Sequence, residues 1–263
     1  MTKSQKNEYW NTFDLKRASF ERKYTNTFGI ALYRTVRDFT EEAKALALTP
    51  EQAIDMVAIK VTDRHIQYAY QKLYEEVMLF FAQGTYRELV KRRKKATPLT
   101  AFRSYIADFL ETLGAVRIND ITKSVRSTIQ GSLRKAVTLG LSIQDTVDVM
   151  LKNRVGFEPY RASRIARTEI ISASNYGSMR GAHETGFLLN KEWLSAIDSR
   201  TRRVPSDQFD HLVMHEVQVG MDEFFQVPKR GGGFELLALP GDHNGSVGNV
   251  INCRCTMAYI PLD

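Results

Sequence analysis

Both cysteines of the chain lie two positions apart near the C-terminus, as Cys253 and Cys255. In an extended segment alternate side chains share one face, so the two thiols would lie side by side. Two thiolates supply half of a tetrahedral zinc site. Three of the five histidines fall in the same last quarter of the chain, namely His211, His215 and His243. The sequence therefore predicts a structural zinc site whose ligands are Cys253, Cys255, His211 and His243.

A single C-x-C motif is less specific for zinc than paired C-x-x-C motifs, and two alternatives stay open. In the first, the thiols are small buried side chains that pack a β-core. In the second, this region is a small metal-dependent hydrolase or transferase domain with Asp198, His211 and the cysteines near its site. His211 and His215 have the spacing of a metalloprotease helix, but Glu216 follows the second histidine instead of the first, so we exclude that class.

A charged loop follows the expected strand at Trp193 and contains Asp198, Arg200 and Arg202. Loops at strand ends often carry catalytic residues. An ion pair between the aspartate and an arginine that ties the loop down is the simpler explanation. No nucleophile elbow, phosphate-binding loop or dinucleotide motif is recognisable. The sequence therefore predicts no catalytic residue and no enzymatic activity.

Five consecutive cations end an expected helix in the first half of the chain. Such a run binds phosphate electrostatically and without sequence preference. Cations are also favoured at a helix C-terminus, which is the alternative explanation. The candidate DNA contacts are Lys91, Arg92, Arg93, Lys94 and Lys95.

Helix-start signals recur along the first 186 residues. The segment Thr49–Gln52 combines a capping threonine, a proline at the first helical position and a capping-box glutamine. Proline begins two further helices, at Pro98 and at Pro159, and Ser142 caps a short one.

Apolar periodicity predicts where these helices run and end. One helix is expected from Pro50 to Gly84, and others end near Gly114, Gly140 and Gly186. Small residues in the last helix predict close packing against a neighbour: Ala166, Ala173, Gly177 and Gly181.

The period changes at Phe187, where alternation replaces helical spacing and predicts strands around Trp193 and from Asn249 to Ile260. We therefore expect an α+β protein, with a long helical N-terminal part over 1–186 and a small, mostly antiparallel β-containing C-terminal domain over 187–263. No secretory signal and no membrane-spanning stretch is recognisable, and two cysteines do not make a disulfide framework.

The net charge of +7 is unevenly distributed. Residues 1–186 carry 30 basic and 20 acidic side chains, whereas residues 187–263 carry 7 basic and 10 acidic ones. Such asymmetry favours contact between the first part and a polyanion such as DNA. A solvated basic helical surface is the alternative. A base-reading host DNA-binding protein has no support, because no reader motif is present.

Several motifs follow one another in a recognisable order. They begin with Ala166-Arg167-Thr168-Glu169 and Lys191-x-Trp193, and continue with Asp198-x-Arg200-Thr201-Arg202 and His211-x-x-Met214. They close with Pro240-Gly241-Asp242 and Asn252-Cys253-Arg254-Cys255. In this order they resemble the phage Mu F-like minor head protein family, or phage head morphogenesis domain, over about residues 140–260. The segment from Arg203 to His211 is longer than in the family, and His215-Glu216 departs from its pattern.

The resemblance implies a virion protein of few copies, bound to the portal protein and held inside the capsid. Scaffold or major capsid protein and non-specific DNA are further implied partners, with the host cytoplasm as the site of assembly. The implied role is head assembly and genome delivery. No catalytic residue carries over, and the motif residues are structural: Arg167, Glu169, Trp193, Asp198, Arg200, Arg202, Asp242, Asn252 and Arg254.

Overall fold

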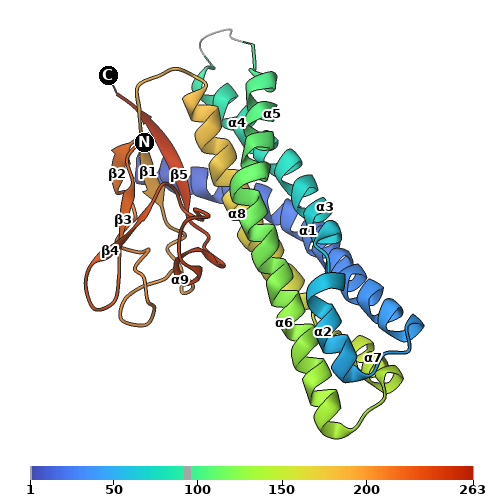
Figure 1. The fold of residues 1–263 in the computed structure, drawn as a ribbon. Coiled ribbons are helices and arrows are strands. Elements are labelled where there is room, and N and C mark those ends of the chain that lie inside the picture. The colour runs from blue at the N-terminus through green and yellow to red at the C-terminus, as the bar shows by residue number, and fades with distance from the viewer. Residues whose placement is uncertain (1, 92–95, 263) are drawn as a thin grey trace. The chain divides into compact units, whose positions relative to one another are not determined.

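A computed structural model describes residues 2–91 and 96–262. It confirms the α+β class, with a long helical part followed by a small antiparallel sheet (Figure 1). The chain divides into two compact units, and both are discontinuous in sequence. Unit 1 comprises Met1–Arg22, Leu73–Phe109 and Arg167–Asp263, and unit 2 comprises Lys23–Lys72 and Leu110–Ala166.

Helices make up most of unit 2 and a large part of unit 1. Their bounds are α1 Lys3–Ala45, α2 Pro50–Lys60, α3 Arg64–Leu73, α4 Leu79–Leu89, α5 Leu99–Phe109, α6 Ala115–Leu139, α7 Ile143–Lys152, α8 Pro159–His183 and α9 Val247–Val250. Two π-helical segments continue α3 and α5, namely η1 Tyr74–Met78 and η2 Leu110–Gly114. No helix of the described residues combines the length and the apolar character that a membrane span requires.

Local start and stop signals act in unit 2 as expected. The Thr49 hydroxyl accepts the Gln52 N–H at 3.3 Å, and the Gln52 side chain accepts the Thr49 N–H at 2.8 Å, which confirms the capping box. Ser142 caps α7 through the Asp145 N–H, and Gly140 ends α6 in the left-handed conformation. Each signal works within a few residues, so the sequence alone reveals it.

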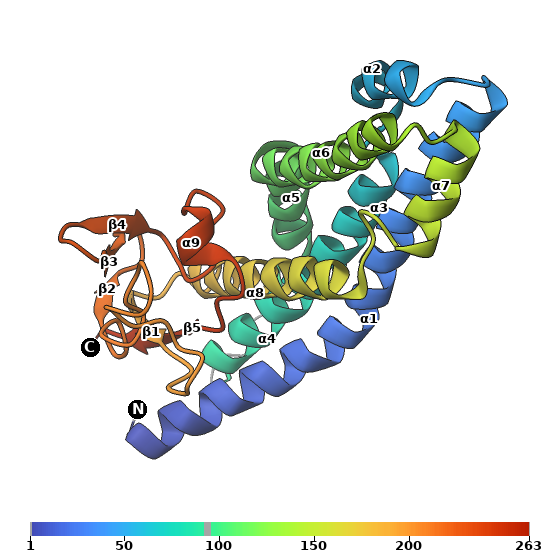
Figure 2. The ribbon, with the colours of Figure 1, turned by 90° about the horizontal axis from the view of Figure 1, so that it is seen from below.

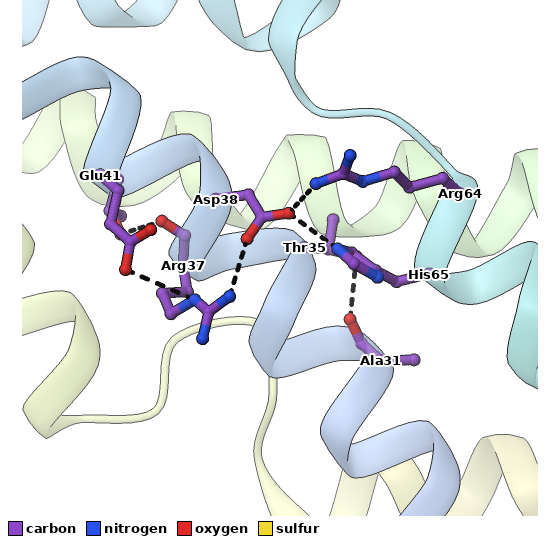
Figure 3. Close-up of polar contacts among 8 residues, drawn as sticks. Ala31, Thr35, Arg37, Asp38, Glu41, Arg64 and His65 are labelled. Atoms are coloured by element: carbon purple, nitrogen blue, oxygen red, sulfur yellow. Dashed lines mark hydrogen bonds and ion pairs between the residues drawn. The ribbon is translucent and has the colours of Figure 1, made fainter. Parts of the chain in front are cut away.

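A carboxylate on α1 joins two helices of unit 2 (Figure 3). Asp38 accepts hydrogen bonds from Arg37 at 3.2 Å, from His65 Nε2 at 2.7 Å and from Arg64. Burial opposes ionisation of Asp38, but the hydrogen bonds from His65, Arg64 and Arg37 outweigh it and lower the pKa to about 2. The charged carboxylate therefore holds the start of α3 against α1.

The C-terminal half of α8 is the centre of unit 1. Residues 168–178 are all buried. A Cβ atom added at Gly177 would lie 2.2 Å from the Met78 carbonyl oxygen, and one at Gly181 would lie 2.3 Å from that of Ala82. Close packing by small residues is thus confirmed, and it brings α8 against η1 and α4.

Five strands complete unit 1. They are β1 Leu189–Leu194, β2 Gln218–Gly220, β3 Phe225–Pro228, β4 Phe234–Leu237 and β5 Thr256–Pro261. Strand β1 lies between β2 and β5 in an antiparallel sheet, while β3 and β4 form a separate hairpin (Figure 1). The mostly antiparallel C-terminal region is therefore confirmed.

Three expected elements differ in the structure. The helix predicted to run from Pro50 to Gly84 ends at Lys60, and a new helix starts at Arg64. Val61 between them is extended, and its carbonyl accepts two hydrogen bonds from the Arg126 guanidinium. Gly114 does not end a helix, since the π-helical turn η2 leads directly into α6.

The third difference concerns the C-terminal strand expected from Asn249. Residues 247–250 form α9 instead, and β5 starts only at Thr256. The change from helix to strand near residue 186 is present, yet the compact units do not follow it, because unit 1 unites the C-terminal region with the start of α1, with α4 and with half of α8.

Candidate metal centre

His211, Cys253 and Cys255 meet in the interior of unit 1. The Nδ1 atom of His211 lies 3.6 Å from each sulfur, and all three ligand atoms lie within 4.8 Å of one another. The side chains are 1%, 1% and 3% exposed, respectively. Two thiols and an imidazole nitrogen converge on one position, and this group could hold a metal ion. The three residues thus lie together, as three of the four ligands that the sequence predicts.

A residue in the left-handed conformation brings the two thiols together, and not the extended strand that the sequence predicts. Asn252 has a φ of +57°, which is less costly for asparagine than for most residues. Its backbone N–H donates to the Thr168 hydroxyl of α8 at 3.2 Å. The Cys255 N–H then donates to the Cys253 sulfur at 3.5 Å. The chain thus folds back over α8 so that both sulfurs face His211.

A hydrogen-bond chain orients His211. Its Nε2 lies 2.5 Å from the Asn249 side-chain oxygen, and the Asn249 amide donates to Glu235 at 2.6 Å. Because Glu235 takes the amide N–H, the Asn249 oxygen faces the ring and accepts from Nε2. The lone pair is then on Nδ1, which points at the sulfurs. Histidines that bind metals are commonly fixed in this way.

The two thiols have different electrostatic surroundings. The contact with Cys255, together with His211 and Arg202, holds the pKa of Cys253 well below its ordinary value. Burial raises the pKa of Cys255, and this outweighs the neighbouring Trp193 and Ser195, which lower it. The surroundings therefore favour the thiolate form at Cys253 over that at Cys255, and a bound cation would favour both, because metals bind the deprotonated sulfur.

A buried arginine of α1 ties the first helix to this region. The Arg17 guanidinium donates to Ser174 Oγ at 2.7 Å, to Asn175 Oδ1 at 2.8 Å and to the Cys255 carbonyl at 3.3 Å. Burial lowers its pKa to about 10, so the side chain stays charged at neutral pH. Its charge faces the two cysteines, which favours their thiolate forms.

His243 does not join the sulfur atoms, contrary to the expected ligand set. Its Nε2 lies 2.8 Å from the Tyr74 hydroxyl and 3.3 Å from Glu169, in a cluster packed by Phe109 and Tyr176. His215 is also placed elsewhere, where its Nδ1 accepts the Ser195 N–H at 3.2 Å. Spacing alone did not distinguish these histidines from His211.

The charged loop is tied down by ion pairs. Asp198 pairs with Arg254 and accepts the Arg200 N–H at 2.9 Å. Arg202 donates to the Ile251 carbonyl. Burial opposes ionisation of Asp198, but the bonds to Arg254 and Arg200 lower its pKa. These residues thus hold the turn that precedes Cys253 in place, which is the structural role expected of them.

The remaining motif residues connect α8 to its surroundings. Arg167 pairs with Glu21 at 2.6 Å, and Glu169 accepts from the Tyr74 hydroxyl at 2.9 Å. Asp242 accepts from the Tyr176 hydroxyl at 2.7 Å and caps its own turn. Trp193 is fully buried, with its ring 5.4 Å from that of His211.

The basic run falls mostly outside the described residues. Arg92, Arg93, Lys94 and Lys95 lie in the segment that the structure does not describe. Lys91 pairs with Glu88 on the preceding turn. The predicted DNA contact therefore stays a prediction.

Sequence reasoning missed the residues that support the centre. Asn249, Glu235 and Arg17 carry no spacing signal relative to the cysteines, because the fold alone brings them together. Since all three ligands are buried, a substrate has no direct access to them. Three protein donors, however, leave the fourth position of a tetrahedral ion open, whereas a closed structural site has four.

Comparison with known proteins gives one similarity. Over 137 residues the chain is 25% identical to the uncharacterized protein YqbB of Bacillus subtilis (strain 168). The aligned region covers 52% of this chain and 42% of YqbB, so the chain spans less than half of that relative. No protein-family model matches the chain, and no solved structure matches it significantly.

Proposed function

We propose that the chain is a phage minor head protein. It joins the procapsid with the portal protein, stays inside the capsid, and assists head assembly and genome delivery. Scaffold and major capsid protein are further partners. One observation supports this proposal above the others. The motif residues that resemble the head morphogenesis domain, spread between positions 167 and 254, lie together in unit 1.

The contacts of these motif residues are structural ones. Arg167, Asp198 and Arg254 form ion pairs, Asp242 caps a turn, and Asn252 anchors the cysteine turn to α8. An assembly protein needs such a rigid unit more than it needs a reactive group, so the arrangement supports a binding role.

The metal of the centre is zinc in this proposal. Two cysteines and one histidine are the soft and borderline donors that zinc prefers. His211, Cys253 and Cys255 would hold the ion, and Asn249 would orient the imidazole. The ion would join the loop at 211 to the C-terminal turn at 253–255 and stabilise the fold.

Non-specific contact with DNA is the second part of the proposal. The excess of basic residues over positions 1–186 supports it. Retention of double-stranded DNA on a filter should fall steeply as salt rises from about 50 mM to about 500 mM, because counterion release drives such binding. Retention that is unchanged at high salt, or absent at low salt, would refute the proposed contact with DNA.

The head function is tested in the phage that encodes the chain. Its gene is deleted and complemented, and heads are purified on a density gradient. We expect the protein in procapsids and virions at far fewer copies than the major capsid protein. The deletion should lower the number of infectious, DNA-filled heads. Heads that lack the protein in the complemented strain would refute the proposal.

A further inference from the structure

The β3–β4 hairpin has a defined hydrogen-bond pattern. Lys229 N–H donates to the Gly233 carbonyl at 3.0 Å across the glycine turn. Bonded and non-bonded pairs alternate in an antiparallel ladder. Since Pro228 lies opposite Phe234, which is a non-bonded pair, the next bonded pair joins residues 227 and 235. The backbone groups of Phe234 and Leu236 therefore point away from β3.

The outer edge of β3 is already paired. Asp210 N–H donates to the Pro228 carbonyl at 3.0 Å, and Phe209 bridges to Lys229. On the β4 side, the hydrogen bonds of residues 2–91 and 96–262 include none to the outward groups of Phe234 and Leu236. Their side chains are 51% and 50% exposed. Strand β4 therefore presents an open backbone edge beside two exposed apolar side chains.

The hairpin is nevertheless firmly held on its other face. Phe225, Val227 and Leu237 are fully buried. Glu235 accepts from Ser246 Oγ at 3.1 Å and from the Asn249 amide. The hairpin extends away from the C-terminal half of α8 in both views (Figures 1 and 2). The open edge is thus a fixed, exposed template and not a frayed end.

We propose that β4 is the docking edge for an extended segment of a partner protein, which pairs with it as an additional strand. Outward N–H and C=O groups of Phe234 and Leu236 supply the ladder, as in other cases of strand addition. Alternate apolar side chains of the partner pack on the two exposed side chains. An acidic residue of the partner faces Lys229 at the turn, whereas the Arg230 guanidinium donates to the Pro205 carbonyl on the β3 side of the hairpin.

A second copy of this chain fits the edge less well. In the antiparallel register that pairs Phe234 of one copy with Leu236 of the other, the two Glu235 side chains lie opposite each other. Like charges directly opposite destabilise a ladder. The charge of the turn is positive, and a partner segment with an acidic end complements it. This inference does not depend on the proposed metal or on the head function.

Peptides of defined sequence test the proposal on the full chain. The probe is a fluorescein-labelled ten-residue peptide that alternates valine with threonine and ends in two aspartates. One control ends in two lysines, and another carries N-methyl groups on all of its amides, which blocks pairing on both edges. Fluorescence anisotropy measures binding. We expect the aspartate peptide to bind at least about tenfold more tightly than either control, a difference of about 1.4 kcal/mol.

Variants of Leu236 distinguish the contribution of its backbone N–H to binding from that of its side chain. Leu236→Pro removes an outward N–H without removing a bond of the hairpin, and should abolish binding. Leu236→Thr keeps that N–H and should retain part of the affinity. Lys229→Glu should reverse the preference between the acidic and basic peptides.

Two results would overturn the inference. The first is that neither peptide binds, or that the N-methylated peptide and Leu236→Pro behave like the unmodified peptide and the wild type. The second is a dimer in sedimentation that Leu236→Pro dissociates, because the edge would then belong to a second copy.

Discussion

The side-chain oxygen of Asn249 lies 2.5 Å from Nε2 of His211, so the imidazole turns its other nitrogen towards the two cysteines. The support of this ring comes from residues that bind no metal themselves. Removal of such support commonly lowers metal affinity about 10- to 100-fold. We expect that loss for Asn249→Ala, measured by competition with a chromophoric zinc chelator. An unchanged affinity would mean that Asn249 has no part in the centre.

The amount of bound zinc should depend on the three proposed ligands, His211, Cys253 and Cys255. We expect about one zinc ion per wild-type chain by elemental analysis. Cys253→Ser and His211→Ala should both lose it. His243→Ala is the matched control and should retain it, because His243 packs with Tyr74 and Glu169. Loss of zinc in the control variant, or its absence from the wild type, contradicts the proposed centre.

Chelation should lower the stability of unit 1. A ligand present at about 100 times its dissociation constant stabilises the folded state by about 2.7 kcal/mol. Removal of zinc should therefore lower the unfolding midpoint of the wild type, and readdition should restore it. Cys253→Ser should unfold at the same point with and without chelator. A chelator effect of equal size in the variant would locate the metal elsewhere.

Two helical glycines should respond oppositely to alanine. At Gly177 the new methyl group would lie 2.2 Å from the Met78 carbonyl oxygen, so α8 and η1 must separate. We expect a loss of about 1–3 kcal/mol. At Gly84 an added Cβ meets nothing within 4 Å, and alanine should add about 0.5–1 kcal/mol through helix propensity. Urea unfolding measures both. Equal effects at the two sites would disprove the close contact.

Asp38 should make stability depend on pH in the acid range. Its folded pKa of about 2 is below the unfolded value of about 3.9. The stabilisation is therefore fully present above about pH 4 and is lost as the pH falls towards 2. Because the carboxylate is partly exposed, its share is about 1–2 kcal/mol.

Asp38→Asn should lose that amount at pH 7 and progressively less below pH 4, by urea unfolding at several pH values. Asp55→Asn, at an exposed position of α2, is the matched control and should change stability by less than about 0.5 kcal/mol. A loss for Asp38→Asn that is independent of pH would mean that packing, and not charge, accounts for it.

The sequence predicts those features that arise within a few residues. The caps at Thr49 and Ser142 and the helix end at Gly140 depend on neighbouring atoms only, and the structure confirms all three. The break after Lys60 was missed, and the Arg126 side chain that binds the extended Val61 lies 65 positions from it in the chain. Helical periodicity continues across the break and gives no sign of it.

The candidate metal centre could likewise be predicted only in part from the sequence. Residue types identified the cysteines, and His211 was one of three histidines in the last quarter of the chain. The choice among them depends on Asn249, whose side-chain oxygen contacts His211 and whose amide donates to Glu235 in the folded chain. His243 was wrongly included because the sequence contains no sign of its contacts with Tyr74 and Glu169, which come from distant parts of the chain.

The bond between Arg17 and the Cys255 carbonyl joins residues 238 positions apart. A ribosome that adds about 5–20 residues per second needs roughly 12–48 s to cover that distance. During this time the start of α1 lacks the C-terminal residues that it contacts, and Arg17 cannot form its bond to the Cys255 carbonyl. We expect unit 1 to close only after Cys255 has left the ribosome, while most of unit 2 is already complete. Proteolysis of stalled nascent chains of increasing length would detect this order, which makes the start of α1 a substrate for chaperones until then.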